Sequence, residues 1–243
     1  MKLLKRLTVI TLILICIFST CPQGVLINLN SKFSESSLIV DKKIIENNKY
    51  LTIDVTIPQI DGLSDKEVEK VINKKILNFT SVWISDVKEI ANEYYGDINN
   101  IEPRFPYQLI SKYIIKRQNK ILSFYIDYYQ FTGGAHGITN RVNYNIDINT
   151  GKEMLLKDLF SDEYEYEKII NNEIEKQIAQ NPDNYFIGKD GFNGINEKQK
   201  YFMDEENIIL FFNEYEIAPY AAGIPEFKIP IKLFGESFKY GNI

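Results

Sequence analysis

The sequence predicts an α+β protein in which antiparallel sheets carry one long helix and one shorter helix, in two closely associated subdomains. Apolar and polar residues alternate as in strands at 50–57, 121–131 and 138–149. Residues 64–94 instead place apolar side chains three and four positions apart, which is the helical spacing, and a shorter stretch of this kind follows residue 161. At 243 residues, the chain is long enough for one large or two small domains.

The N-terminal segment, residues 1–24, is predicted to be a targeting sequence rather than part of the fold. Lys2, Lys5 and Arg6 precede the apolar run Leu7–Phe18, which only two threonines interrupt. These twelve residues match the apolar core of a signal peptide and fall short of the ~20 residues that span a bilayer. The segment is therefore expected to be a signal peptide or an N-terminal anchor, and it is the only contact with a membrane that we expect.

Three alternatives for this segment stay open: cleavage, retention as an anchor, and lipidation at Cys21. In all three, the positive N-terminus indicates that residues 25–243 are extracytoplasmic, either secreted or anchored to the outer face of the cytoplasmic membrane. Both cysteines, Cys16 and Cys21, lie in or just after the apolar run. The sequence after them therefore offers no disulfide, thiolate nucleophile or cysteine metal site, which points to a bacterium that does not rely on disulfides outside the cell.

The charge of the chain limits its partners. The formal net charge is −5, and removing the three positive charges of the leader leaves −8. An acidic surface repels phosphate backbones, so we expect no nucleic-acid partner. The same charge attracts a basic protein.

Residues 25–60 are predicted to form strands, followed by the long helix. Alternate positions of the run 50–57 are apolar: Leu51, Ile53, Val55 and Ile57. Ser64 and Glu67 match a capping box, which predicts that a helix begins there and continues to residue 94. Its apolar positions are Val68, Val71, Ile72, Ile76, Phe79, Trp83, Val87, Ile90 and Tyr94. The tryptophan on this stripe is expected to pack the helix onto a sheet.

Two strands, 107–118 and 121–131, are predicted to form a hairpin about Asn119 and Lys120. The second strand has an apolar face and a polar-aromatic face: Leu122, Phe124, Ile126 and Tyr128 alternate with Ser123, Tyr125, Asp127, Tyr129 and Phe131. A buried core does not need tyrosine on the second face, so this face is a candidate recognition surface. A further strand is expected at 138–149.

The last third of the chain is predicted to hold the shorter helix and the closing strands. Ser161 is a plausible N-cap for this helix, and its inner stripe is Ile170, Ile174 and Ile178. Strands are expected at 208–212 and 224–233, and two prolines place the second of them at a sheet edge. Between these strands, residues 215–223 form an aromatic turn rich in small residues.

The only histidine lies in the glycine-rich turn 128–137 and has two interpretations. As a general base or a ligand, His136 needs partners, but the sequence has no G-x-S-x-G elbow, no P-loop and no second histidine. As a structural residue, it bonds a neighbouring carbonyl while the glycines adopt positive φ. We favour the structural interpretation, because no spacing singles out a carboxylate pair such as Asp127 and Asp147. We therefore expect no catalytic residue, no metal ligand and no cofactor.

Two stretches of the sequence carry a family resemblance. The first comprises YQFTGGAHG at 129–137, YNIDINTGKE at 144–153 and LKDLF at 156–160, and the second is FFNEYEIAPYAAGIPEF at 211–227. Together they resemble the paired extracellular domains of unknown function found in RsiV-like anti-sigma factors and beside the catalytic domain of PdaC-like peptidoglycan deacetylases. The resemblance implies an N-terminal module at 35–137 and a C-terminal module at 138–236.

The resemblance implies a binding function. RsiV-like proteins sense lysozyme through this ectodomain, which is consistent with an acidic chain that meets a very basic protein. Because six residues precede the apolar run and the chain has one histidine, we expect neither sigma-factor inhibition nor a deacetylase site. We expect a non-enzymatic cell-envelope module that binds lysozyme or peptidoglycan. The alternative is a cell-wall hydrolase or esterase that uses His136 and nearby carboxylates.

The expected contact surface consists of residues in and beside the two turns. Recognition of sugar rings or of a protein, and ordinary packing, both stay open for their aromatic side chains. The expected binding residues are Tyr129, Phe131, Gly133, Gly134, His136, Tyr215, Pro219 and Tyr220.

Overall fold

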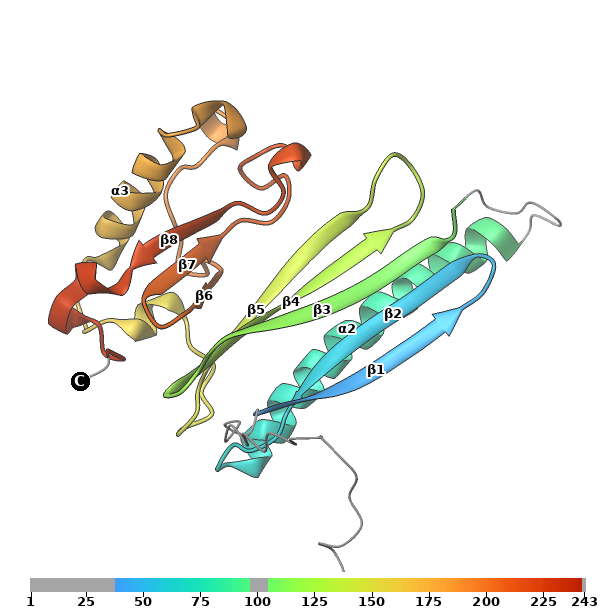
Figure 1. The fold of residues 1–243 in the computed structure, drawn as a ribbon, viewed down its shortest axis with the longest axis horizontal. Coiled ribbons are helices and arrows are strands. Elements are labelled where there is room, and N and C mark those ends of the chain that lie inside the picture. The colour runs from blue at the N-terminus through green and yellow to red at the C-terminus, as the bar shows by residue number, and fades with distance from the viewer. Residues whose placement is uncertain (1–37, 97–104, 242–243) are drawn as a thin grey trace, which may run out of the picture. The chain divides into compact units, whose positions relative to one another are not determined.

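The computed structural model describes residues 38–96 and 105–241. The predicted targeting segment, 1–24, lies outside these residues, as do positions 25–37 of the expected strand region. Within the described residues, no helix is long and apolar enough to cross a membrane. The fold is α+β, as predicted, with two sheets and two α-helices in the described part of the chain (Figure 1).

The larger sheet has the strand order β1-β2-β3-β4-β5. Its strands are β1 (Ile39–Asn47), β2 (Leu51–Ile60), β3 (Tyr107–Gln118), β4 (Ile121–Phe131) and β5 (Ile138–Asp147). The predicted hairpin of β3 and β4 is confirmed. Neighbouring strands are antiparallel except β2 and β3, which are parallel. The sheet is mixed at this pair because the helix α2 (Lys66–Gly96) joins the two strands as a crossover connection.

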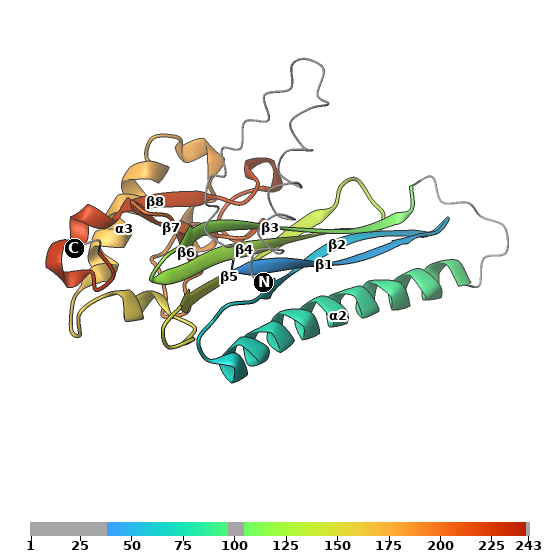
Figure 2. The same cartoon turned by 60° about the horizontal axis from the view of Figure 1, so that its bottom comes forward.

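Helix α2 covers one face of the five-stranded sheet and forms the first core with it (Figure 2). The predicted apolar face of β2 is buried, since none of its four residues exceeds 4 % exposure. Trp83 packs the helix onto β4, as predicted. Its indole N–H donates to Gln130 Oε1 over 2.8 Å, and its ring meets the Tyr128 ring edge-on, with the centroids 5.0 Å apart.

The buried stripe of α2 differs from the predicted one. Val71, Phe79, Ile90 and Tyr94 are exposed, and the buried positions are Ile72, Ile76, Thr80, Ile84, Val87, Ala91 and Tyr95. Each four-residue step moves such a stripe by about 40° around the helix. Because the sheet beneath the helix is twisted, its line of contact drifts around the helix, whereas the prediction assumed a straight stripe.

The N-cap of α2 is Asp65, one residue after the predicted Ser64. Asp65 Oδ1 accepts the backbone N–H groups of Glu67 and Val68 over 3.0 and 3.1 Å. The capping box at Ser64 is therefore wrong by one position, because the aspartate reaches the free N–H groups of the first turn.

The smaller sheet is antiparallel, with the order β6-β7-β8. Its strands are β6 (Tyr201–Met203), β7 (Asn207–Phe211) and β8 (Glu226–Pro230), and helix α3 (Tyr166–Ile178) packs against it. Strand β8 lies at the edge, as its prolines predict. Short 3-10 helices occur at Leu156–Leu159, Pro182–Asn184, Gly188–Asp190, Tyr220–Ala222 and Ile231–Ser237.

Helix α3 buries two residues of its predicted stripe, Ile170 and Ile174, but it does not begin at Ser161. The N-cap is Glu165. The helix cannot begin at Ser161, because Glu163 has a φ of 61°, which is incompatible with a right-handed helix. The Ser161 hydroxyl instead donates to the carbonyl of Ser237 over 3.3 Å.

The two sheets pack through the polar-aromatic face of β4. Tyr125 is only 4 % exposed, and its ring contacts both the ring of Phe202 and the guanidinium of Arg141. Ser123 is fully buried, and its hydroxyl oxygen accepts the backbone N–H of Met203 over 2.9 Å. Of the two alternatives left open for Tyr125, ordinary packing is the one observed, because strand β6 covers this residue.

Strand β5 contacts both sheets. It pairs with β4 from Ile138 to Asp147, and the Asn145 side-chain amide donates to the carbonyl of Tyr201 on β6 over 2.8 Å. The expected module boundary between residues 137 and 138 falls between two paired strands. The division into modules at 35–137 and 138–236 stays a prediction.

Arg141 on β5 forms ion pairs with a carboxylate in each of the two sheets. The side chain is 8 % exposed, and it donates to both carboxylate oxygens of Asp127, from Nε over 2.6 Å and from Nη2 over 2.9 Å. Its Nη1 donates to Glu226 on β8. Burial alone disfavours the charged guanidinium, but the hydrogen bonds and charges of the two carboxylates outweigh it and raise the pKa of Arg141.

Replacing the buried cation tests this link. Arg141→Met leaves Asp127 and Glu226 without their cation, so we expect the free energy of unfolding to fall by about 3 kcal/mol. Urea denaturation followed by the fluorescence of Trp83, the single tryptophan, measures the change. As a control, Lys152→Met breaks the exposed pair with Asp158 and is expected to cost less than about 1 kcal/mol. Equal losses in the two variants would contradict a special role for Arg141.

The buried phenol of Tyr128 predicts a loss of stability in alkali. Burial raises its pKa to about 12, although the hydrogen bond with Thr80 opposes the shift. The unfolded chain loses this proton near pH 10. Stability is therefore complete below about pH 10 and falls by up to about 1.4 kcal/mol per pH unit as the pH rises toward 12. Urea denaturation at about pH 9, 10 and 11 should show a shallower loss in Tyr128→Phe, and parallel curves would refute this assignment.

Candidate functional site

Two turns that are far apart in the sequence meet beside the edge strand β5. The first is the glycine turn at 132–137 between β4 and β5, and the second is the segment 213–223 after β7; together they are called the turn pair. The ring of His136 stacks on the ring of Tyr220, with centroids 3.7 Å apart and planes at 15°. His136 Nε2 also lies 3.4 Å from the Tyr215 hydroxyl. The turn pair therefore brings together parts of both stretches that carry the family resemblance.

The ring nitrogens of His136 lie near a backbone carbonyl and a phenol hydroxyl. Its Nδ1 lies 2.9 Å from the carbonyl oxygen of Gly137, the neighbouring carbonyl that the structural interpretation predicts. Among residues 38–96 and 105–241, no carboxylate lies within hydrogen-bonding distance of its ring nitrogens. The described residues also contain no cluster of three or more His, Cys, Asp or Glu side chains that could hold a metal ion.

Side chains of the second turn anchor it to the open edge of β5. The backbone N–H of Thr139 donates to a carboxylate oxygen of Glu214 over 3.1 Å, and that of Arg141 donates to Asn213 Oδ1 over 2.9 Å. The Asn213 amide group in turn donates to Asn140 Oδ1 over 2.8 Å. These side chains take the place of a neighbouring strand, so this part of the edge is closed to strand pairing.

The structure gathers four of the expected binding residues. Tyr129 lies close to the first turn, because a Cβ atom at Gly137 would approach its hydroxyl to 2.5 Å. Tyr129 also lies near enough to Tyr220 to affect its ionisation. His136, Tyr215 and Tyr220 form one aromatic group, and Tyr129 lies near it.

The other expected residues shape the two turns. Gly133 and Gly134 have φ values of 93° and 91°, which a residue with a Cβ rarely adopts. Phe131 is the last residue of β4 and is half-buried. Pro219 precedes the 3-10 helix of the second turn.

The turn pair offers phenol hydroxyls and aromatic rings beside acidic side chains. Desolvation raises the pKa of Tyr220, and the charge of Glu214 adds to the shift, so its hydroxyl stays protonated at neutral pH. Tyr215 is 48 % exposed and has a φ of 65°. Such a strained backbone persists where the surrounding structure holds it, and it is common at functional sites. Phenol hydroxyls and stacked ring faces therefore lie together in the turn pair.

The sequence did not identify the residues that hold the turn pair together. Asn213 and Glu214 lie in the second stretch of the family resemblance, but they look like ordinary surface residues after a strand. Their backbone partners on β5 are more than 70 positions away. The sequence did not single out Arg141 as a contact between the sheets either, because its partner Glu226 is 85 positions away.

Two stretches of this α+β chain match models of known protein families. Residues 44–139 match the family described as deacetylase PdaC, and residues 157–232 match the protein family of unknown function DUF3298. The chain is similar to the anti-sigma-V factor RsiV of Bacillus subtilis strain 168, with 27 % identity over 211 residues. That match covers 77 % of this chain and 66 % of the relative, just under two thirds of its length. The predicted resemblance is confirmed.

Two solved structures share the fold. A member of the DUF3298 family from Bacteroides fragilis NCTC 9343 aligns with a TM-score of 0.59 and 20 % identity, over 84 % of this chain and 94 % of its own. A DUF3298 family protein from Pseudomonas aeruginosa PAO1 aligns with a TM-score of 0.53 and 15 % identity, over 83 % and 93 % of the two chains. At these identities the likeness establishes the fold, and it confirms the α+β class.

A double-mutant cycle tests the contact between the two turns. Stacking of His136 on Tyr220 predicts a coupling free energy of about 0.5–1.5 kcal/mol between His136→Ala and Tyr220→Leu. Urea denaturation of the wild type, the two single variants and the double variant measures this coupling. Pairing His136→Ala with Tyr164→Leu, whose ring packs on Phe160 and Phe234 and has no contact with either turn, should give additive effects. Additivity in the first cycle as well would show that the turns do not support each other.

Proposed function

We propose that this chain is a non-enzymatic, extracytoplasmic cell-envelope module that binds lysozyme or peptidoglycan through the turn pair. The observation that carries the proposal is the stacked group of His136, Tyr215 and Tyr220, which both turns build together. Tyrosine at the centre of a contact surface supplies a large buried area and a hydrogen bond at low entropic cost. The similarity to an anti-sigma factor supports a binding role in signalling.

The charge of the chain favours a basic protein among these partners. The net charge is −5 over the whole sequence. Glu214 and Glu216 lie in the second turn itself, and Glu216 is exposed. Lysozyme is strongly basic, so long-range attraction would speed its approach and tyrosines would supply the contact. The predicted leader, which lies outside the described residues, would deliver the module to the outer side of the membrane.

The contacts of His136 do not favour the alternative function, a cell-wall hydrolase or esterase that uses His136 and nearby carboxylates. A general base needs a free ring nitrogen within reach of a nucleophile or water, and a partner that orients it. His136 has its Nδ1 at a carbonyl, its Nε2 near a phenol and its ring against Tyr220. Turnover of wall fragments that disappears in His136→Ala would revive the hydrolase or esterase.

Calorimetric titration of the full chain, kept in a mild detergent, tests the proposal with lysozyme and with soluble muropeptides. We expect at least one of them to bind, and Tyr220→Ala to weaken that binding by about tenfold or more, as for a central tyrosine in an interface. If lysozyme is the partner, its affinity should fall as the salt concentration rises.

The matched control is Tyr94→Ala, which removes a tyrosine that is 58 % exposed on helix α2. This variant is expected to bind like the wild type. Absence of heat with both ligands would overturn the proposed function. An equal loss of affinity in Tyr220→Ala and Tyr94→Ala would show that the turn pair is not the binding surface.

A further inference from the structure

Helix α2 carries a second set of apolar residues on a side that the sheet does not cover. Val71, Phe79, Val82 and Ile90 are 66, 40, 59 and 44 % exposed, and together they are called the outer stripe. Val71 and Val82 are eleven positions apart, as are Phe79 and Ile90, and eleven residues are close to three full turns. The four side chains therefore form two adjacent lines along the helix. Exposed apolar residues that are grouped in this way mark an interaction surface.

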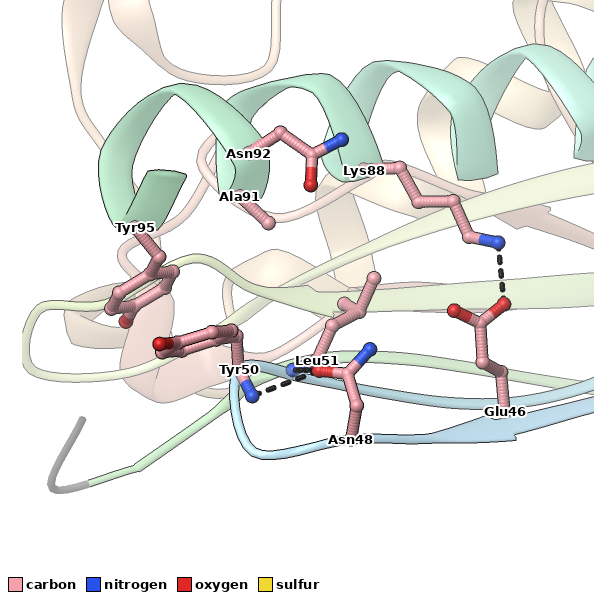
Figure 3. Close-up of a pocket in the computed structure, with 8 residues that line it drawn as sticks. All are labelled: Glu46, Asn48, Tyr50, Leu51, Lys88, Ala91, Asn92 and Tyr95. Carbon is pink, nitrogen blue, oxygen red and sulfur yellow. Dashed lines mark hydrogen bonds and ion pairs between the residues drawn. The ribbon is translucent and has the colours of Figure 1, made fainter. Parts of the chain in front are cut away.

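The charge of α2 changes sign along its length. Residues 66–81 hold four lysines and two glutamates, a balance of +2, whereas 82–96 hold one lysine and three acidic residues, a balance of −2. The lysine of the second half, Lys88, is turned toward the sheet, where its Nζ lies 2.5 Å from Glu46 Oε2 (Figure 3). The acidic residues of this half are all exposed: Asp86, Glu89 and Glu93. The outer surface of α2 is therefore basic in its first half and acidic in its second.

The stability of the helix itself does not account for these carboxylates. The helix dipole favours cations in the last turn, but the last turn of α2 holds Glu93 and no basic residue. Within residues 38–96 and 105–241, neither Glu89 nor Glu93 has an ion-pair partner. Both carboxylates are therefore available to a partner that brings a cation.

The outer surface of α2 is complementary to a second copy of itself. Position 82 lies midway between 75 and 89 and midway between 78 and 86. When two copies of α2 pack antiparallel about a two-fold axis at Val82, Lys75 of each copy lies opposite Glu89 of the other. In the same way, Asn78 lies opposite Asp86. The axis brings the two Val82 side chains together, and the two Phe79 rings lie beside them.

Lys75 can form this contact without losing the one it already makes. Its Nζ lies 2.5 Å from Glu153 Oε2, and 56 % of the side chain is exposed. An ammonium group has three protons to donate, so it can bind a second carboxylate from the solvent side.

We propose that the protein forms a two-fold homodimer by antiparallel packing of the outer surfaces of α2. A second copy suits this surface better than a membrane or an unrelated protein. An anionic membrane would meet three carboxylates, and a partner of one charge sign would be attracted by one half of α2 and repelled by the other. The dimer goes beyond the proposed function and does not depend on it.

Sedimentation equilibrium of the full chain, in a detergent matched to the density of the solvent, measures the association. We expect a dissociation constant on the order of 10 µM, as for a small interface. Lys75→Glu opposes two carboxylates at each of the two symmetric contacts, so it should weaken association by about tenfold or more. Glu89→Lys opposes two lysines and should have the same effect. The double variant exchanges the charges and should restore association to within about threefold of the wild type.

The matched control is Glu153→Gln, which breaks the pair of Glu153 with Lys75 within one chain but leaves the outer surface of α2 unchanged. It should associate like the wild type. Unfolding followed by Trp83 fluorescence should show that all these variants fold.

Disulfide cross-linking tests the position of the axis, in a background with Cys16→Ser and Cys21→Ser. Mild oxidation of Val82→Cys should give a covalent dimer, because the two thiols meet at the axis. Ser81→Cys is the matched control, since position 81 is also exposed but points about 100° away around the helix. It should stay monomeric on denaturing gels.

A chain that stays monomeric up to about 1 mM would overturn the dimer. Undiminished association in Lys75→Glu, no recovery in the double variant, or equal cross-linking of the two cysteine variants would overturn α2 as its interface. None of these measurements uses lysozyme or peptidoglycan, so failure of the dimer would leave the proposed function standing.

Discussion

The arrangement of the two sheets depends on the buried charge of Arg141. Its guanidinium binds Asp127 on the neighbouring strand β4 and Glu226 on β8, and its plane covers the ring of Tyr125 at 3.8 Å. Its backbone N–H binds Asn213 at the start of the second turn. A buried cation is tolerated only with its partners in place, so the same residue fixes how the sheets face each other and where the turn pair forms.

The two faces of the five-stranded sheet are covered in different ways. Helix α2 covers the apolar face, where burial of aliphatic and aromatic side chains supplies the stability. Strand β6 covers the other face, where Ser123 and Asn145 bond its backbone and Tyr125 packs on Phe202. The polar-aromatic face of β4 therefore forms an internal contact between the two sheets. The exposed aromatic side chains lie instead in the turn pair, beside the C-terminal end of β4.

The turn pair depends on the edge of the five-stranded sheet. The backbone N–H groups of Thr139 and Arg141 on β5 donate to Glu214 and Asn213, which attaches the second turn to this strand. The position of the turn pair therefore depends both on the pairing of β5 with β4 and on the ion pair of Arg141 with Glu226 between the sheets.

The sequence by itself determined the local elements and the family resemblance. The alternation in β2 and β4, the hairpin about Asn119 and Lys120 and the long helix depend on residues close together in the chain, where periodicity and turn chemistry are informative. Only the tertiary structure decided the drifting stripe of α2, the burial of Tyr125 and the contact of His136 with Tyr220. Each of these depends on partners brought together by the packing of two sheets, and separations such as the 79 positions between His136 and Tyr215 leave no trace in a local pattern.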